Sequence, residues 1–184
     1  GLEVDHESEV ISISLSFKAC FFINNNNKER EQKGSAISCD RSQNSGNLQL
    51  TIEDCYFERN QNEGKGCAIY ANIKNAITID NCIFTDNIGS EKGSIYIVPD
   101  DSEISQIPIV ISNCNFKHNQ INDYSSIYVE PGLQRSIKVI SCIFENEKGG
   151  IVLDDFKNGA EINGNHFLNT QAKSALIIKH YADS

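Results

Sequence analysis

The sequence predicts an all-β fold, a right-handed parallel β-helix (a solenoid) of about six coils with three short strands per coil. Three observations predict it. Two short phrases of residues alternate six times along the chain, apolar residues recur with a period of two inside each phrase, and the connections between strands are very short. Residues 1–10 precede the first copy and are expected to form an N-terminal extension, with 11–184 as one domain.

The first phrase consists of an alternating aliphatic pair, two turn residues, a Cys, any residue and a Phe. Its spacings of 35, 27, 32, 28 and 23 residues are in the range of repeat architectures. The second phrase has two small residues followed by two aliphatic residues with one residue between them. The first phrase is marked by Cys20, Cys55, Cys82, Cys114, Cys142 and, in a degraded sixth copy, Asn165. The second covers 35–39, 67–71, 93–97, 125–129, 149–153 and 174–178.

A period of two is the signature of a β-strand, because successive side chains point to opposite faces. The strand that carries each Cys follows its predecessor after only two residues, which is too few for a parallel crossover within one sheet. Consecutive strands therefore belong to different walls, and equivalent strands of successive copies are expected to pair in parallel.

This arrangement places like residues above one another and predicts ladders of Ile, Phe and Cys inside. Ile52, Cys55 and Phe57 are expected to point inward and Thr51 outward. An asparagine falls three residues after the Phe in the first four copies, where stacked amides can hydrogen-bond and Asn tolerates a left-handed turn. These residues are Asn25, Asn60, Asn87 and Asn119. In the last two copies the asparagine shifts to Asn146 and Asn169, so the ladder is expected to break there.

The seven cysteines are expected to be buried thiols that act as small hydrophobic residues. Neighbours in the ladder would be about 4.8 Å apart with parallel Cβ vectors, which does not suit a disulfide. Cys39 is expected to face inward and Cys67 to lie at a turn. Because no Cys-x-x-Cys pair or histidine cluster is present, neither a metal site nor a cofactor is expected.

Charge and hydropathy exclude several classes of partner. The net charge of −9 argues against nucleic acid and anionic membranes. No apolar run approaches the roughly 20 residues of a membrane span, so no membrane insertion by this chain is expected. The chain begins with Gly-Leu-Glu-Val, which favours a processed product or a fragment of a longer solenoid or assembly.

The motifs resemble those of the polymorphic outer-membrane proteins of chlamydiae and of related protist repeats, which alternate Phe-x-x-Asn with Gly-Gly-Ala followed by Ile, Leu or Val. The first motif is present four times, from Phe22 to Asn25 onward, and the second appears loosely as Gly34 to Ile37 and Gly66 to Ile69. The resemblance implies a surface-displayed adhesin passenger.

Tyr70, Tyr96 and Tyr128 share one outward position on three consecutive copies and are the best binding candidates. A row of exposed rings could stack on sugars or dock a protein. In that case, replacing all three with Ser would leave the fold intact. The alternative is a structural ladder of rings, or rings covered by a long turn such as 98–108.

An enzymatic alternative rests on carboxylates, because β-helices include many polysaccharide lyases and hydrolases and glycosidases need paired carboxyl groups. Glu130 and Asp154 occupy equivalent positions of neighbouring copies, with Asp155 beside them. The simpler interpretation is that these carboxylates belong to a solvated acidic turn region with no catalytic role. The four histidines form no recognisable catalytic motif, so no catalytic residue is assigned.

The sequence therefore predicts a non-enzymatic structural or adhesive protein that binds a protein or a neutral glycan and pairs end to end. The runner-up is a polysaccharide-acting enzyme, either a pectate-lyase-like lyase or a glycoside hydrolase. We expect an extracellular or cell-surface location, with an intracellular structural assembly as the alternative.

Overall fold

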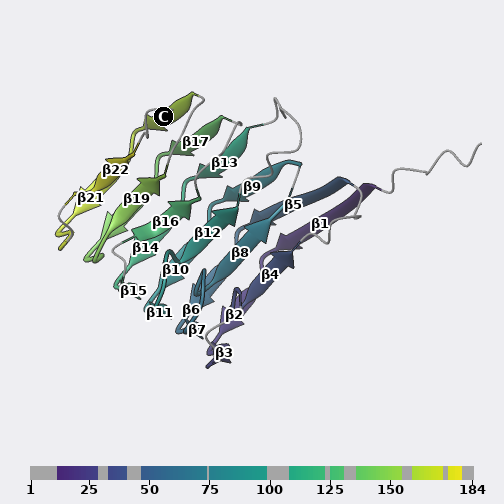
Figure 1. The fold of residues 1–184 in the computed structure, drawn as a ribbon, viewed down its shortest axis with the longest axis horizontal. Coiled ribbons are helices and arrows are strands. Elements are labelled where there is room, and N and C mark those ends of the chain that lie inside the picture. Colours follow the sequence, from purple (N-terminus) through teal and green to yellow (C-terminus); the bar gives the residue numbers. More distant parts are fainter. Residues whose placement is uncertain are drawn as a thin grey trace, which may run out of the picture.

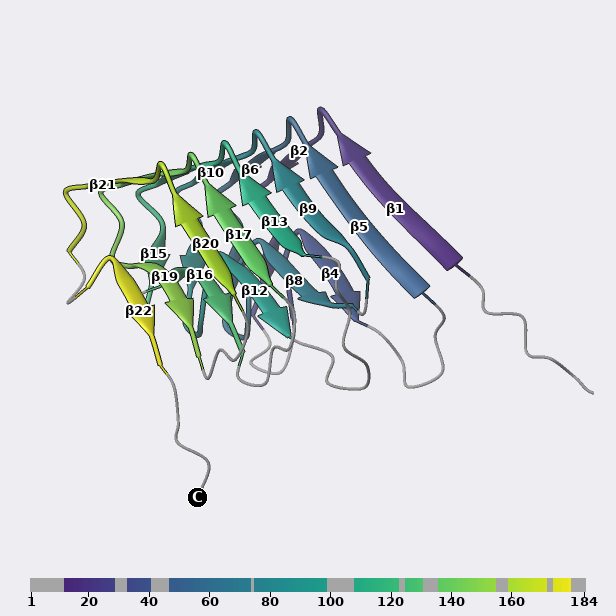
Figure 2. The same ribbon diagram turned by 90° about the horizontal axis from the view of Figure 1, so that it is seen from above.

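The computed structural model describes residues 12–28, 33–40, 47–73, 75–98, 108–122, 125–130, 136–154, 159–171 and 174–179. Within these ranges the chain forms 22 strands and no helix. The strands build four parallel sheets that run along one stack, from the N-terminal repeat at one end to the C-terminal repeat at the other (Figures 1 and 2).

The first and second sheets contain the strands of the Cys-x-Phe phrase. The first sheet consists of β1 (Ser12–Lys18), β5 (Asn47–Glu53), β9 (Ile77–Asp80), β13 (Ile109–Ser112), β17 (Ile137–Ile140) and β20 (Ala160–Asn163). The second sheet consists of β2 (Phe21–Ile23), β6 (Tyr56–Glu58), β10 (Ile83–Thr85), β14 (Asn115–Lys117), β18 (Ile143–Glu145) and β21 (His166–Leu168).

The third sheet is short, and the fourth contains the strands of the small-residue phrase. The third sheet consists of β3 (Asn26–Asn27), β7 (Gln61–Asn62), β11 (Ile88–Gly89) and β15 (Gln120–Ile121). The fourth sheet consists of β4 (Ile37–Asp40), β8 (Ile69–Asn72), β12 (Ile95–Val98), β16 (Ser125–Val129), β19 (Gly150–Leu153) and β22 (Leu176–Ile178).

The predicted parallel pairing of equivalent strands is confirmed, and the fold is a parallel β-solenoid. Ile79 pairs with Ile52 of the preceding repeat and Ile111 of the following one. The expectation of three strands per repeat is wrong for the first four repeats, each of which adds a strand to the third sheet. These strands have only two residues, so no periodicity in the sequence could indicate them.

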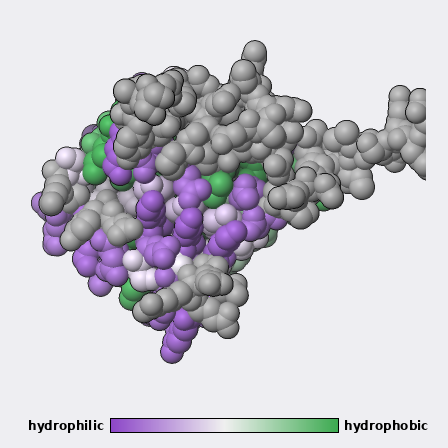
Figure 3. All heavy atoms as spheres, viewed as in Figure 1, coloured by the Kyte–Doolittle hydropathy of each residue, from purple (hydrophilic) through white to green (hydrophobic). Residues whose placement is uncertain are grey.

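The predicted phenylalanine ladder is the centre of the core. Ring centroids of successive Phe residues are 4.7–4.9 Å apart and the planes differ by 3–7°. The inner four rings have no exposed surface, as befits a close-packed interior. The ladder consists of Phe22, Phe57, Phe84, Phe116, Phe144 and Phe167. In the view of Figure 3 the described surface is largely hydrophilic, with small hydrophobic patches.

The cysteine ladder is also confirmed, and all seven thiols are free. Each inner thiol donates to the carbonyl oxygen two residues earlier, as in Cys55 to Glu53 at 3.1 Å and Cys114 to Ser112 at 3.1 Å. The residue between them has positive φ, 56° at Asp54 and 54° at Asn113. A Cys therefore fills the core and satisfies a turn carbonyl, which an aliphatic residue could not do.

The asparagine ladder joins the first four repeats. Asn25, Asn60 and Asn87 each donate a side-chain N–H to the amide oxygen of the next asparagine, at 2.8, 3.0 and 2.8 Å. The left-handed turn geometry belongs instead to the residue before each ladder asparagine, such as His118 at φ 56° before Asn119. Asn146 occupies that turn position in the fifth repeat, with φ 53°, which explains the predicted break.

Candidate functional site

The tyrosine row exists, but its rings are not exposed. Tyr96 pairs in register with Tyr70 and Tyr128, and the ring centroids are 5.7 and 5.3 Å apart. The three residues are only 3%, 0% and 3% exposed and pack with Val152 in a second apolar cluster. The expected exposed wall is therefore wrong, and the alternative of a structural aromatic ladder is confirmed. Part of the long turn considered as a cover, 99–107, lies outside the described residues.

Lysine side chains cover part of each tyrosine ring. The Nζ atoms of Lys33, Lys65 and Lys92 lie 4.9, 5.1 and 4.3 Å from the ring centroids of the tyrosine one repeat further along. A cation over a ring face is attracted by the ring quadrupole, and the aliphatic stem of lysine adds apolar contact. The tyrosines thus form an apolar layer on the outer face of the fourth sheet, beneath charged groups.

A glycine after each of these lysines makes room for the layer. Gly66 and Gly93 have φ of 69° and 73°, in the left-handed region. A Cβ atom at Gly66 would lie 3.1 Å from Cβ of Tyr96, and one at Gly93 would lie 3.3 Å from Cβ of Tyr128. The Lys-Gly pair that recurs before the small-residue phrase is the sequence signal for this layer, and strand alternation alone does not reveal it.

Three carboxylates complete the layer. Lys33 donates to Asp40 at 2.7 Å, and Lys65 donates to Glu130 at 2.8 Å. The hydroxyl of Tyr96 also donates to Glu130. Tyr128 donates to Asp154 at 2.5 Å and accepts a hydrogen bond from Lys92 at 2.7 Å.

The pKa shifts follow from these contacts. Burial raises the pKa of the Tyr70 hydroxyl above its ordinary value. Burial alone would raise the pKa of Asp40, but hydrogen bonds from Lys33 and Asn72 lower it below its ordinary value. The hydrogen bond to Asp40 raises the pKa of Lys33. The layer therefore holds a charged lysine against a charged carboxylate.

The carboxylates of the predicted alternative site lie in this layer. Val129 pairs with Leu153, and the backbone N–H of Asp154 donates to the carbonyl oxygen of Val129 at 3.1 Å, which places Glu130 and Asp154 directly after the ends of the neighbouring strands β16 and β19, at equivalent positions as predicted. Each carboxylate accepts a tyrosine hydroxyl, and each forms an ion pair, with Lys179 reaching Asp154 at 3.6 Å. Asp155 lies outside the described residues. The geometry favours a structural role for this pair.

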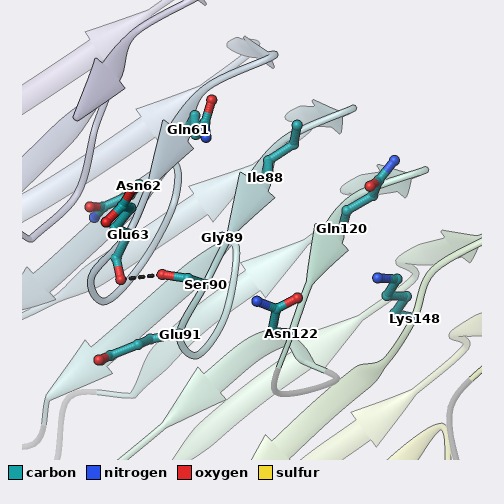
Figure 4. A pocket seen from close by; sticks show the side chains of 10 residues that line it. All are labelled: Gln61, Asn62, Glu63, Ile88, Gly89, Ser90, Glu91, Gln120, Asn122 and Lys148. Carbon is teal, nitrogen blue, oxygen red and sulfur yellow. Dashed lines mark hydrogen bonds between the residues drawn. The ribbon is translucent and has the colours of Figure 1, made fainter. Parts of the chain in front are cut away.

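The described surface is hollowed over the third sheet, in a depression of about 530 Å³ (Figure 4). Gln61, Ile88 and Gln120 occupy equivalent register positions on the neighbouring strands β7, β11 and β15, and Lys148 lies beyond them on the side of Gln120 and Asn122. Acidic and small polar groups lie beside the loops. A second depression of about 470 Å³ shares Gln120 and Lys148. The remaining lining residues of the first are Asn62, Glu63, Gly89, Ser90, Glu91 and Asn122.

The shorter fifth repeat ends the third sheet beside this depression. The chain has 11 residue steps from Phe116 to Ile127 but only 7 from Phe144 to Ile151, which leaves no length for another strand after β15. Glu147 lies in this shortened segment and ends the asparagine ladder, because its Oε1 accepts the side chain of Asn119 at 3.0 Å and its backbone N–H at 2.8 Å. The shift to Asn146 in the sequence predicted the break in the asparagine ladder, but it did not indicate that Glu147 takes the place of the next asparagine.

Within the described ranges, no group of three or more His, Cys, Asp and Glu side chains could hold a metal ion. The same part of the chain contains no helix that could span a membrane.

Burial raises the pKa of Cys55 to about 11 and that of Cys67 to about 12, which keeps both thiols protonated at neutral pH.

The chain was compared with models of known protein families, with curated protein sequences and with solved structures, and no significant match was found.

Proposed function

We propose that the protein is a non-enzymatic structural or adhesive β-solenoid that binds a neutral glycan along the depression over β7, β11 and β15. The observation that carries the proposal is the lining of the depression, which combines side-chain amides, carboxylates and a hydroxyl with the exposed side chain of Ile88. Amide and carboxylate groups suit sugar hydroxyls, and an apolar side chain suits the C–H face of a sugar ring.

The wider assignment rests on the sequence repeats and their resemblance to chlamydial passengers. Six copies of each phrase, with six strands in three of the sheets, support six coils. Connections between parallel strands are strongly right-handed in proteins, which supports a right-handed β-helix. An adhesin at the cell surface or outside the cell fits the resemblance, whereas seven free thiols also suit an intracellular structural assembly.

End-to-end assembly is supported by the outermost ladder residues. Phe22 and Phe167 are only partly buried, while Phe57, Phe84, Phe116 and Phe144 have no exposed surface. A further repeat stacked on either end would bury more of these rings.

A glycan array followed by calorimetry tests the proposal. The variant replaces Gln61 and Gln120 with Ala and Ile88 with Ser, and its control replaces the exposed Gln49 of β5 with Ala. We expect a neutral glycan to bind the wild type and the control, and to bind the depression variant about tenfold or more weakly. Equal binding to all three proteins would overturn the proposal.

The enzymatic alternative is tested on acidic and neutral polysaccharides, with and without calcium. The hydrogen bonds and ion pairs of Glu130 and Asp154 argue against a role in general acid–base chemistry. Product release that is lost in Glu130→Gln and Asp154→Asn variants of unchanged stability would make the protein an enzyme.

A further inference from the structure

The outer face of the second sheet carries an exposed apolar row that neither the core nor the depression uses. Phe21, Tyr56 and Ile83 occupy equivalent register positions on β2, β6 and β10, the neighbouring strands visible in Figure 1. Phe21 is 75% exposed, Ile83 is 41% exposed and Tyr56 is partly exposed. We call these three residues the Phe21 stripe.

The Phe21 stripe is a continuous surface. The ring centroids of Phe21 and Tyr56 are 6.0 Å apart, and Ile83 follows on the next strand of the same sheet. Each residue stands between the inward Cys and Phe of its repeat, so the residues on either side of it already fill the core. Exposed aromatic residues that gather in one place mark interaction surfaces more often than scattered ones do.

The charged groups around the stripe are mainly acidic. Five carboxylates and two cations flank it in sequence and in the adjoining turns. Lys18 is paired with Glu53 at 3.1 Å, and Arg59 is paired with Glu58 at 2.7 Å. The carboxylates are Glu53, Asp54, Glu58, Asp80 and Asp86.

This rim selects the partner by charge. A second copy of the chain docked stripe to stripe would bring the same acidic rim against itself, where like charges repel. A protein segment with apolar side chains between lysines or arginines would bury the three side chains and neutralise the rim.

We propose that the Phe21 stripe docks a partner protein through a segment that presents apolar side chains flanked by Lys or Arg. This surface is separate from the depression over the third sheet, and the proposal does not depend on glycan binding. The central apolar side chains would supply affinity, while the acidic rim would supply orientation and association rate.

Two short labelled peptides test the proposal by fluorescence anisotropy. Both alternate the same Leu and Phe residues with charged residues, which are Lys in one peptide and Glu in the other. The stripe variant is Phe21→Ser, Tyr56→Ser and Ile83→Ser together. Its control replaces Ser16, Thr51 and Thr78, which lie at equivalent positions on the outer side of the first sheet, with Ala. Thermal unfolding verifies that both variants fold.

We expect the Lys peptide to bind the wild type and the control, and to lose about tenfold or more in affinity for the stripe variant. Added salt should weaken the binding. The depression variant described above should bind the Lys peptide as the wild type does, which separates this test from that of the glycan proposal. Absent binding of the Lys peptide to the wild type, equal binding of the Glu peptide, or dimerisation that is lost in the stripe variant would each overturn the proposal.

Discussion

Glu147 ends the ladder of asparagine amides with a group that can change its charge. It is 1% exposed, and Ser126 donates to its Oε2 at 2.5 Å. Burial raises the pKa of Glu147 from an ordinary value of 4.5 to about 7, the nearby charge of Asp86 adds to the rise, and hydrogen bonds from Ser126 and Asn119 oppose it. The Cys67 thiol also faces this group and stays protonated near neutral pH.

The raised pKa predicts that stability falls with increasing pH. Folding favours the protonated acid between pH 4.5 and about 7, so this contribution is full below 4.5, declines across that window and is absent above it. The loss is on the order of 3 kcal/mol. Glu147→Gln should remove this pH dependence and stabilise the protein at pH values above the window, as measured by urea unfolding across the pH range. Glu145→Gln is the matched control, and an unchanged pH slope in Glu147→Gln would contradict the assignment.

The phenylalanine ladder gives a second prediction for a single residue. Phe84 is stacked between Phe57 and Phe116 at 4.7 and 4.8 Å, so its neighbours cannot close the space left by a smaller residue. Phe84→Ala should lower the free energy of unfolding by about 3–5 kcal/mol. The exposed Phe21→Ala is the control and should cost less than about 1 kcal/mol in chemical denaturation. A similar small loss in Phe84→Ala would mean that the ring is not interior.

At the scale of the elements, the tyrosine layer separates what the sequence could predict from what it could not. Strand alternation placed Tyr70, Tyr96 and Tyr128 on one outer row, and the register confirms that position. Alternation says only that a side chain points away from the inner core. It could not show that lysines one repeat earlier would cover the rings, because this contact depends on the path of the turn at Gly34, Gly66 and Gly93.

The buried layer predicts a stability loss rather than an intact fold when its rings are removed. Tyr96 has no exposed surface and stacks on both neighbouring rings. Tyr96→Ser should cost about 3–5 kcal/mol in chemical denaturation, similar to other large-to-small core changes. Tyr56→Ser, in a partly exposed ring of the second sheet, should cost clearly less. Equal small losses in the two variants would contradict a structural role for the layer.

The same limits apply to the candidate sites. The alignment of Glu130 with Asp154 followed from the repeat and is correct. The sequence could not reveal that each carboxylate accepts a hydrogen bond from a tyrosine hydroxyl and forms an ion pair with a lysine. The depression lies over β7, β11 and β15, and the shorter fifth repeat, after which the third sheet has no further strand in the described residues, contributes Lys148 to its lining. Its two-residue strands were too short to be predicted from periodicity.

At the scale of the whole molecule, the fold is a stack in which equivalent residues repeat their environment. The Phe, Cys and Asn ladders were each predicted from the spacing of one phrase, because a parallel register converts sequence repetition into spatial stacking. The proposed glycan site borders the short fifth repeat, where the repetition fails, and the proposed docking site is the Phe21 stripe on the outer face of the second sheet.

The central claim is that this stack encloses the cysteine ladder as free, buried thiols, and thiol titration tests it most directly. Six of the seven cysteines are buried and Cys20 is partly buried. The native protein should therefore expose at most one or two reactive thiols to a labelling reagent, and the unfolded protein should expose all seven, as counted by mass spectrometry without added reductant. Rapid labelling of most cysteines in the native protein, or two or more disulfides, would contradict the stacked interior.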